Sequence, residues 1–274
     1  MALKHVLVHV DGSSRVDVRL RLALSVCRSR RARLTALFAE GVSLGASIVG
    51  RRSPDAMAAA ARTAQAAFTA TVEAAGVEGA WWALDAAGDV GRLAGEVAIC
   101  CRYADLAVFG QPHAEATVPI DVLESAIVES GRPVLVVPDA GAFETLGTRV
   151  VIAWTGSRES ARAVNDAVSL MSGAELVAIL AFQQKGLGGS GAFPNLDIVG
   201  HLRAHGIEAR YERVIVDDAD EVGVADTALN RCADLAADLL VMGARPGHGF
   251  GAARLAGPAR SLLHSMSTPV LLSA

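Results

Sequence analysis

The chain repeats its own plan, and this internal duplication constrains its fold more than any other feature. The segments "HVLVHVDGSSRVDVRLRLALSV" from His5 and "RVVIAWTGSRESARAVNDAVSL" from Arg149 share an apolar strand, a Gly-Ser turn and an amphipathic helix. Two later pairs match in the same order, "RYADLAVFGQP" with "LAADLLVMGARP" and "GRPVLVVP" with "STPVLLSA". The matched positions lie 144, 133 and 136 residues apart. Three matches in one order at nearly one period indicate a tandem duplication.

Within each copy, short apolar strands alternate with longer helical stretches. The strands "LAVF", "VLVV" and "DLLVMG" lack polar alternation, which is typical of a sheet that is buried on both faces. Alternation of strand and helix predicts parallel strands joined by right-handed crossovers. We therefore expect two tandem doubly wound α/β domains, each with a five-stranded parallel sheet, over residues 1–140 and 146–274.

The same patterns predict the individual elements. Strands are expected near 4–10, 33–39, 79–85, 105–110, 133–137, 148–154, 174–182, 208–216, 238–243 and 269–273. Helices are expected near 14–30, 54–76, 89–103, 120–131, 157–172, 194–205, 220–236 and 257–266. The closing strands 133–137 and 269–273 are apolar edges that need covering, so we expect them to meet within one chain.

Composition narrows the classes of partner. The chain has 274 residues and is 52% hydrophobic, yet no apolar run approaches the roughly 20 residues of a membrane helix. The N-terminal segment does not resemble a signal peptide. A net charge of −4 and a pI near 6.0 argue against a nucleic-acid partner. These features predict a cytoplasmic protein with neither a membrane nor a nucleic-acid partner.

A glycine-rich loop in "VMGARPGHGFGAARLAGPAR" (241–260) joins a strand to a helix in the second copy. Loops of this kind often hold phosphates on backbone N–H groups. The other glycine-rich segment, "QQKGLGGSGAFPN" (183–195), has neither the P-loop order nor a G-x-S-x-G motif, which argues against the simplest hydrolase. No Cys, His or Asp spacing resembles a metal site.

The strand with its "DGS" or "TGS" turn, the "ADLLVMG" strand, the glycine loop and the closing "PVLL" strand resemble the universal stress protein family in its tandem, two-domain form. The resemblance covers both halves of the chain. It implies a Rossmann-like fold of the adenine nucleotide alpha hydrolase type. It also implies a non-catalytic, regulatory role in the stress response, with ATP or AMP bound in the members of the nucleotide-binding branch.

That branch carries G-x-x-G, nine residues, then G-[ST] after the fourth strand. Here Gly247 and Gly257 enclose nine residues, which fits, whereas Gly243 and Gly247 enclose three residues rather than two. Pro258 replaces the Ser or Thr, and so removes one N–H and one hydroxyl. Each lost hydrogen bond to a charged group is worth about 1.5–3 kcal/mol. Positive charge could offset part of this loss, from Arg245, Arg254 and Arg260.

The resemblance places a nucleotide site in the second copy. Its candidate residues are Ala153, Thr155, Met242, Gly243, Arg245, Gly247, His248, Gly249, Gly257, Ala259, Arg260 and Ser261. Thr155 stands where nucleotide-binding members have an Asp that holds the nucleoside end. The first copy keeps this residue as Asp11, but its loop after Gly110 has no glycine and carries carboxylates that would repel phosphate. We therefore expect the first-copy site, with Asp11 and Gly110, to be degenerate.

Two functions remain open. The first is a non-catalytic stress-response protein, an internal pseudo-dimer that binds ATP, AMP or another adenine nucleotide in its second domain and could dimerise further. The second is a structural or protein-interaction role without nucleotide, which Pro258, Thr155 and the extra loop residue favour. Slow ATP hydrolysis is a weaker third hypothesis, because no general base or metal-binding carboxylate is evident in the second copy. No metal cofactor is expected.

Overall fold

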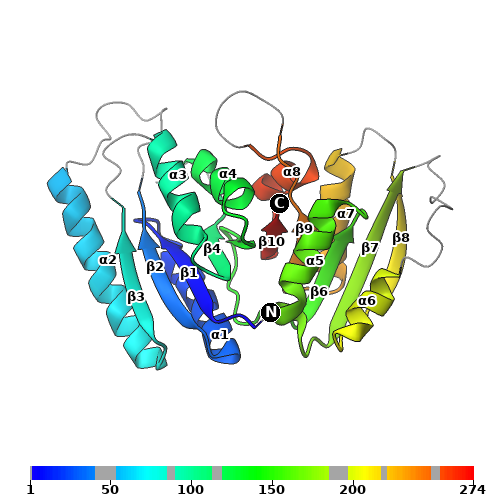
Figure 1. Cartoon of the computed structure of the whole chain (residues 1–274), viewed down its shortest axis with the longest axis horizontal. Helices are drawn as coiled ribbons and strands as arrows, with labels where there is room; N and C mark the ends of the chain where they lie inside the picture. The colour runs from blue at the N-terminus through cyan, green and yellow to red at the C-terminus, as the bar shows by residue number, and fades with distance from the viewer. Residues whose placement is uncertain are drawn as a thin grey trace.

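The chain forms one ten-stranded sheet covered by helices on both faces (Figure 1). The computed structural model describes residues 2–40, 54–84, 90–112, 119–184, 197–216, 221–247 and 254–274. The first half, up to residue 140, contains β1 (His5–Val10), α1 (Val16–Arg30), β2 (Arg33–Phe38), α2 (Pro54–Ala75), β3 (Gly79–Ala83), α3 (Val90–Cys101), β4 (Leu106–Gly110), α4 (Ile120–Glu129) and β5 (Val134–Val137). The second half, from residue 146, contains β6 (Arg149–Trp154), α5 (Arg158–Met171), β7 (Leu176–Gln184), α6 (Ile198–Ala204), β8 (Arg210–Val216), α7 (Glu221–Asp234), β9 (Leu239–Gly243), α8 (Pro258–Ser265) and β10 (Val270–Ser273).

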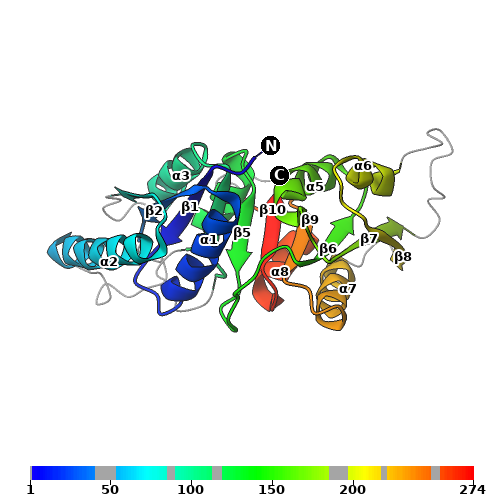
Figure 2. The same cartoon turned by 90° about the horizontal axis from the view of Figure 1, so that it is seen from below.

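The strand order β3-β2-β1-β4-β5-β10-β9-β6-β7-β8 contains the same five-strand arrangement twice. All neighbouring strands run parallel except the central pair, β5 and β10. These two strands pair antiparallel, with Leu135 opposite Leu271, and lie side by side at the centre of Figure 2. The prediction that the closing strands meet within one chain is confirmed. The two expected five-stranded sheets are therefore joined into one.

Two apolar cores, one on each face, run through both halves. One core gathers side chains of α1, α2, α5 and α6, and the other gathers those of α3, α4, α7 and α8. Helices on both faces of a parallel sheet define the doubly wound class, as the unbroken apolar strands predicted. None of the helices in the described ranges is both long and apolar enough to cross a bilayer.

An aspartate anchors the first strand of each half in the same way. The Asp105 carboxylate, just before β4, accepts a hydrogen bond from the N–H of His5 at 3.0 Å. The Asp238 carboxylate, just before β9, accepts one from the N–H of Arg149, also at 3.0 Å. This shared contact explains why "AD" precedes the fourth strand of both copies. The division of the chain into domains 1–140 and 146–274 stays a prediction, compatible with the end of β5 at residue 137 and the start of β6 at 149.

Because β5 and β10 join the two sheets, we expect both halves to unfold together. Leu135 and Leu271 are fully buried at this junction. Leu135→Ala should lower the free energy of unfolding by about 2–5 kcal/mol, through lost burial and a cavity. Urea unfolding followed by circular dichroism and tryptophan fluorescence should show one transition with both probes. The exposed Tyr103 provides the control, since Tyr103→Ala should change stability by no more than about 0.5 kcal/mol. Separate transitions for the two halves would contradict this expectation.

Candidate functional site

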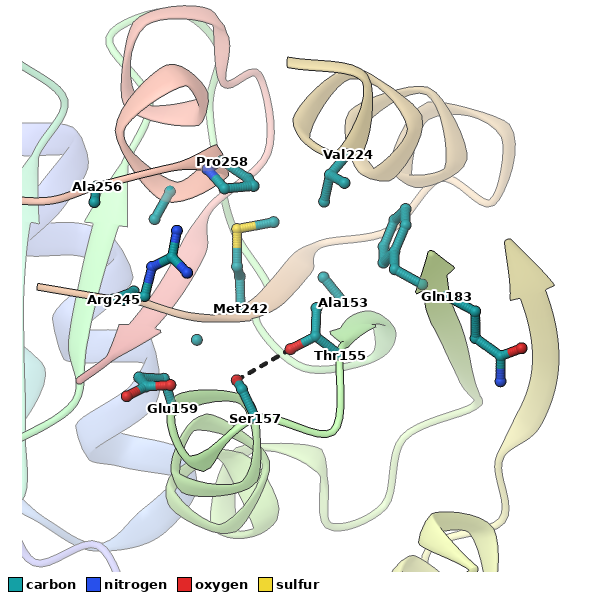
Figure 3. Close-up of a pocket in the computed structure, with 13 residues that line it drawn as sticks. Ala153, Thr155, Ser157, Glu159, Gln183, Val224, Met242, Arg245, Ala256 and Pro258 are labelled. Atoms are coloured by element: carbon teal, nitrogen blue, oxygen red, sulfur yellow. Dashed lines mark hydrogen bonds between the residues drawn. The ribbon is translucent and has the colours of Figure 1, made fainter. Parts of the chain in front are cut away.

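A pocket of about 520 Å³ opens at the carboxyl ends of β6 and β9 in the second half (Figure 3). Ligands of doubly wound sheets bind at this edge, and the volume falls within the usual range of small-molecule sites. The lining residues are Ala153, Thr155, Ser157, Glu159, Phe182, Gln183, Val224, Met242, Gly243, Arg245, Ala256, Pro258 and Ala259.

The turn from β6 into α5 forms the polar floor of the pocket. Ser157 caps α5, because its hydroxyl accepts a hydrogen bond from the N–H of Ser160 at 3.1 Å. The Thr155 hydroxyl in turn bonds that of Ser157 at 3.0 Å, as Figure 3 shows. A Cβ on Gly243 would lie 2.5 Å from the N atom of Ser160 and 2.6 Å from the carbonyl carbon of Glu159. Only glycine therefore lets β9 end this close to α5.

Half of the predicted site residues line this pocket. They are Ala153, Thr155, Met242, Gly243, Arg245 and Ala259. His248 and Gly249 lie outside the described residues. The prediction missed Ser157, Glu159, Phe182, Gln183, Val224, Ala256 and Pro258 as lining residues. Phe182 and Gln183 could have been found, because they lie near the carboxyl end of β7, the strand beside β6. Val224 comes from α7, and no local signal in the sequence indicates its position.

The remaining candidates have other contacts. Gly257 is the N-cap of α8, with φ of 67°, and Pro258 is the first helical residue, as expected for an opening Gly-Pro. Gly247, by contrast, lies outside the left-handed region, and a Cβ there would be 3.4 Å from the carbonyl oxygen of Arg254. The backbone conformation therefore requires glycine at 257 but not at 247. Ser261, in the first turn of α8, is half-buried and does not line the pocket.

Arg260 points toward the other half of the chain. Its Nε lies 3.6 Å from Oε1 of Glu124, a fully buried residue of α4 in the first half. Burial raises the pKa of Glu124, while Arg260 and the N–H of Leu255 favour its charged form. The expected contribution of Arg260 to a phosphate site is therefore opposed by a carboxylate from the first half.

The corresponding site of the first half is filled by its own side chains. Its cavity measures about 30 Å³, against about 520 Å³ for the second-half pocket. The buried Arg19 guanidinium bonds Asp11 and lies against Gly110. The His9 and Phe109 rings stack with centroids 5.2 Å apart. At the matching positions of the second half stand Ala163, Thr155, Gly243, Ala153 and Met242.

Asp11 is held in its charged form. Burial by itself raises the pKa of Asp11, but His9, Arg19 and the Ser13 hydroxyl beside it hold that pKa well below the usual range. The Asp11 carboxylate is thus engaged by the guanidinium of Arg19. Within the described residues, the first-half cavity is much smaller than the second-half pocket, and the degenerate first-half site stays a prediction.

The fold and the pocket define a tandem doubly wound α/β protein with a ligand-sized site in its second half. The model of the Universal stress protein family matches residues 148–273, which include every element of that half. Residues 148–273 therefore belong to the universal stress protein family, and the whole chain has the fold of its tandem, two-domain members. The resemblance predicted from the sequence is confirmed.

Two solved structures that match nearly the whole chain support this assignment of the fold. A universal stress protein from Archaeoglobus fulgidus DSM 4304 matches 98% of this chain and 97% of its own, with a TM-score of 0.73 and 18% identity. A putative universal stress protein from Pseudomonas aeruginosa UCBPP-PA14 matches 99% and 93%, with a TM-score of 0.62 and 14% identity. A universal stress protein from Archaeoglobus fulgidus, in complex with dAMP, matches 50% of this chain and 98% of its own, with a TM-score of 0.36 and 18% identity. A search of curated proteins gave no match.

The buried pair in the first half generates a prediction about stability and pH. Arg19→Ala leaves Asp11 buried without its cation and should lower the free energy of unfolding by about 3–5 kcal/mol at pH 7. The pKa of Asp11 in the folded state lies below its ordinary 3.8, so the pair stabilises the protein above that pH and less as the pH falls below it. Urea titrations at pH 7 and pH 3 should therefore show a smaller acid-induced loss for Arg19→Ala than for the wild type.

Two further variants test the cause of that loss. Arg19→Ala combined with Asp11→Asn removes the unpaired charge and should recover a large part of the stability. Arg21 lies exposed on the same helix, so Arg21→Ala should have an effect within about 0.5 kcal/mol. Equal effects of Arg19→Ala and Arg21→Ala would contradict the role of the pair.

Proposed function

We propose that the protein is a non-catalytic, regulatory stress-response protein that binds an adenine nucleotide or its nucleoside in the second-half pocket. The observation that carries this proposal is the contrast between two equivalent positions of one fold. The second-half pocket has a volume of about 520 Å³, whereas its first-half counterpart has about 30 Å³. A duplicated site that stays open in one copy and is filled in the other is best explained by ligand binding in the open copy.

The pocket lining suits a molecule with one apolar and one polar end. Phe182, Met242 and Val224 supply apolar surface, and all three are largely buried. Such surface can pack against the faces of a base. The hydroxyl groups of Thr155 and Ser157 lie at the turn after β6, where they can hydrogen-bond a sugar. We infer that Thr155 does this in place of an aspartate, with weaker hydrogen bonds because it carries no charge.

The lining favours binding over catalysis. The Ser157 hydroxyl is engaged as the N-cap of α5. Among the described lining residues, the one carboxylate is that of Glu159. A general base must lie within hydrogen-bond reach of the proton that it removes. No histidine lines the described pocket, and no three metal-ligating side chains gather within the described ranges. Neither an activated serine nor a metal-bound phosphate is therefore part of the proposal.

A second candidate function is a protein-interaction role without nucleotide. The N–H of Gly247 donates to the carbonyl of Arg254 at 2.7 Å, and that of Ala256 donates to the carbonyl of Arg245 at 3.0 Å. These two backbone donors are thus engaged within the loop and are not free for a phosphate. This observation favours the second candidate, and ligand titration separates the two.

The open pocket can be closed with residues taken from the closed one. Ala153 and Ala259 correspond to His9 and Leu123, which line the first-half cavity. The double variant Ala153→His/Ala259→Leu should fill the site and abolish binding of adenosine, AMP and ATP, as measured by calorimetry. Wild-type protein should also gain thermal stability as ligand is added, by about 2.7 kcal/mol when its concentration is 100 times the Kd.

The control places the same imidazole on the surface. Ala70 lies exposed on α2, so Ala70→His should leave both ligand binding and the unfolding temperature unchanged. The filled variant without ligand should unfold in one cooperative transition. Absence of binding by wild-type protein to all three ligands at millimolar concentration would refute nucleotide binding and leave the interaction role.

A further inference from the structure

The two described ends of the loop beside the pocket, residues 245–247 and 254–256, pair with each other. Pro246 and Leu255 form an antiparallel bridge. On either side of it, the N–H of Gly247 bonds the carbonyl of Arg254 and the N–H of Ala256 bonds that of Arg245. A phosphate that used the N–H of Gly247 or of Ala256 would have to break one of these bonds, because both groups have a carbonyl partner already. Inserting an anion here therefore gains much less than in a loop with free donors.

The first turn of α8 is equally poor in donors. Pro258 has no N–H, and the N–H of Arg260 bonds the carbonyl of Gly257 at 3.1 Å. Among the first three residues of α8, Ala259 is left to offer an N–H to a ligand. Helix N-termini bind phosphates through several N–H groups at once. The single N–H of Ala259 can donate one hydrogen bond, which is too few to hold a chain of phosphates.

A buried carboxylate from the first half weakens the positive charge of this region. Glu124 is fully buried, and Arg260 and the N–H of Leu255 favour its charged form. Arg260 lies 3.6 Å away, and Arg254 is near enough to favour the charged form of Glu124. Two of the three arginines that could attract phosphate, Arg254 and Arg260, therefore already face a negative charge. In a buried setting, that charge is screened little by solvent or salt.

A second carboxylate lines the pocket itself. Glu159, the second residue of α5, lies beside Gly243, and its side chain is 15% exposed. Figure 3 shows it on the same side of the pocket as Arg245. A polyphosphate on this side would meet Glu159 within the pocket and Glu124 behind α8. Like charges at such positions disfavour binding.

We propose that this pocket selects a nucleoside or nucleoside monophosphate over polyphosphates, and that Glu124, from the opposite half, is the residue that sets this preference. The proposal rests on the proposed nucleotide binding and narrows its ligand class. Base and sugar would occupy the apolar surface and the hydroxyl groups, and at most one phosphate would reach the N–H of Ala259. Glu124 acts through Arg260, and so is a positioning residue that does not touch the ligand.

The test compares adenosine, AMP and ATP by calorimetry at one ionic strength, without divalent metal. Wild-type protein should bind adenosine and AMP with similar Kd values and ATP at least about tenfold more weakly. Glu124→Gln releases Arg260 from its carboxylate, and should tighten ATP binding by about tenfold, the lower end of a hydrogen bond to a charged group. Its Kd for adenosine should not change, because adenosine carries no phosphate.

Two controls test whether the change in ATP binding depends on Glu124 and Arg260. Glu129→Gln makes the same change of charge on the same helix, where the side chain bonds Ser125 at 2.6 Å, and should leave the ATP Kd unchanged. Adding Arg260→Gln to Glu124→Gln should cancel the tighter ATP binding, since the released guanidinium is then missing. The unfolding temperature of each variant without ligand checks that the fold is kept.

The outcomes separate this proposal from the one on which it rests. If adenosine binds but ATP binds wild-type protein equally well, or if Glu124→Gln leaves the ratio of the two Kd values unchanged, the preference is refuted and nucleoside binding stands. If none of the three ligands binds wild-type protein or Glu124→Gln, nucleotide binding is refuted, and the preference with it.

Discussion

The antiparallel pairing of β5 with β10 is the interaction on which the rest of the structure depends. It joins two five-stranded sheets that would otherwise expose apolar edge strands, and it lets each core continue from one half into the other. It also sets α4 against α8, so that a first-half residue, Glu124, reaches Arg260 beside the second-half pocket. One pairing therefore stabilises the chain and connects its two halves at the candidate site.

Duplication within one chain allowed equivalent positions to diverge. Glu124 and Arg260 lie 136 residues apart, the spacing that also separates Pro133 from Pro269. Two identical chains would place like residues at both positions, whereas a tandem chain can place opposite charges there. A second pair of equivalent positions differs in the same way. Arg19 fills its position in the first half, whereas the small Ala163 stands at the matching position in the second half.

Much of the fold could be predicted, because local patterns decide it. Unbroken apolar strands and helical periodicity predicted every described strand and helix to within a few residues. Part of the candidate site could also be predicted from the sequence. Thr155 follows β6 and Gly243 ends β9, and the carboxyl ends of these strands meet at one edge of the sheet. Val224 and Glu124 could not be found in this way, because they approach the site from elements distant in sequence. The hydrogen bond from Gly247 to Arg254 was equally hidden, since glycine spacing does not show which carbonyl an N–H meets.

The sequence by itself determined the duplication, the doubly wound class and the place of the pocket, because these follow from periodicity and from strand ends. Only the tertiary structure decided which of the two equivalent sites is open and how charge is arranged around it. The physical reason is that cavity volume and charge neutralisation depend on distances between residues far apart in the chain. Asp11 illustrates this: the sequence shows an aspartate at the end of the first strand, and the fold places the cation of Arg19 against it.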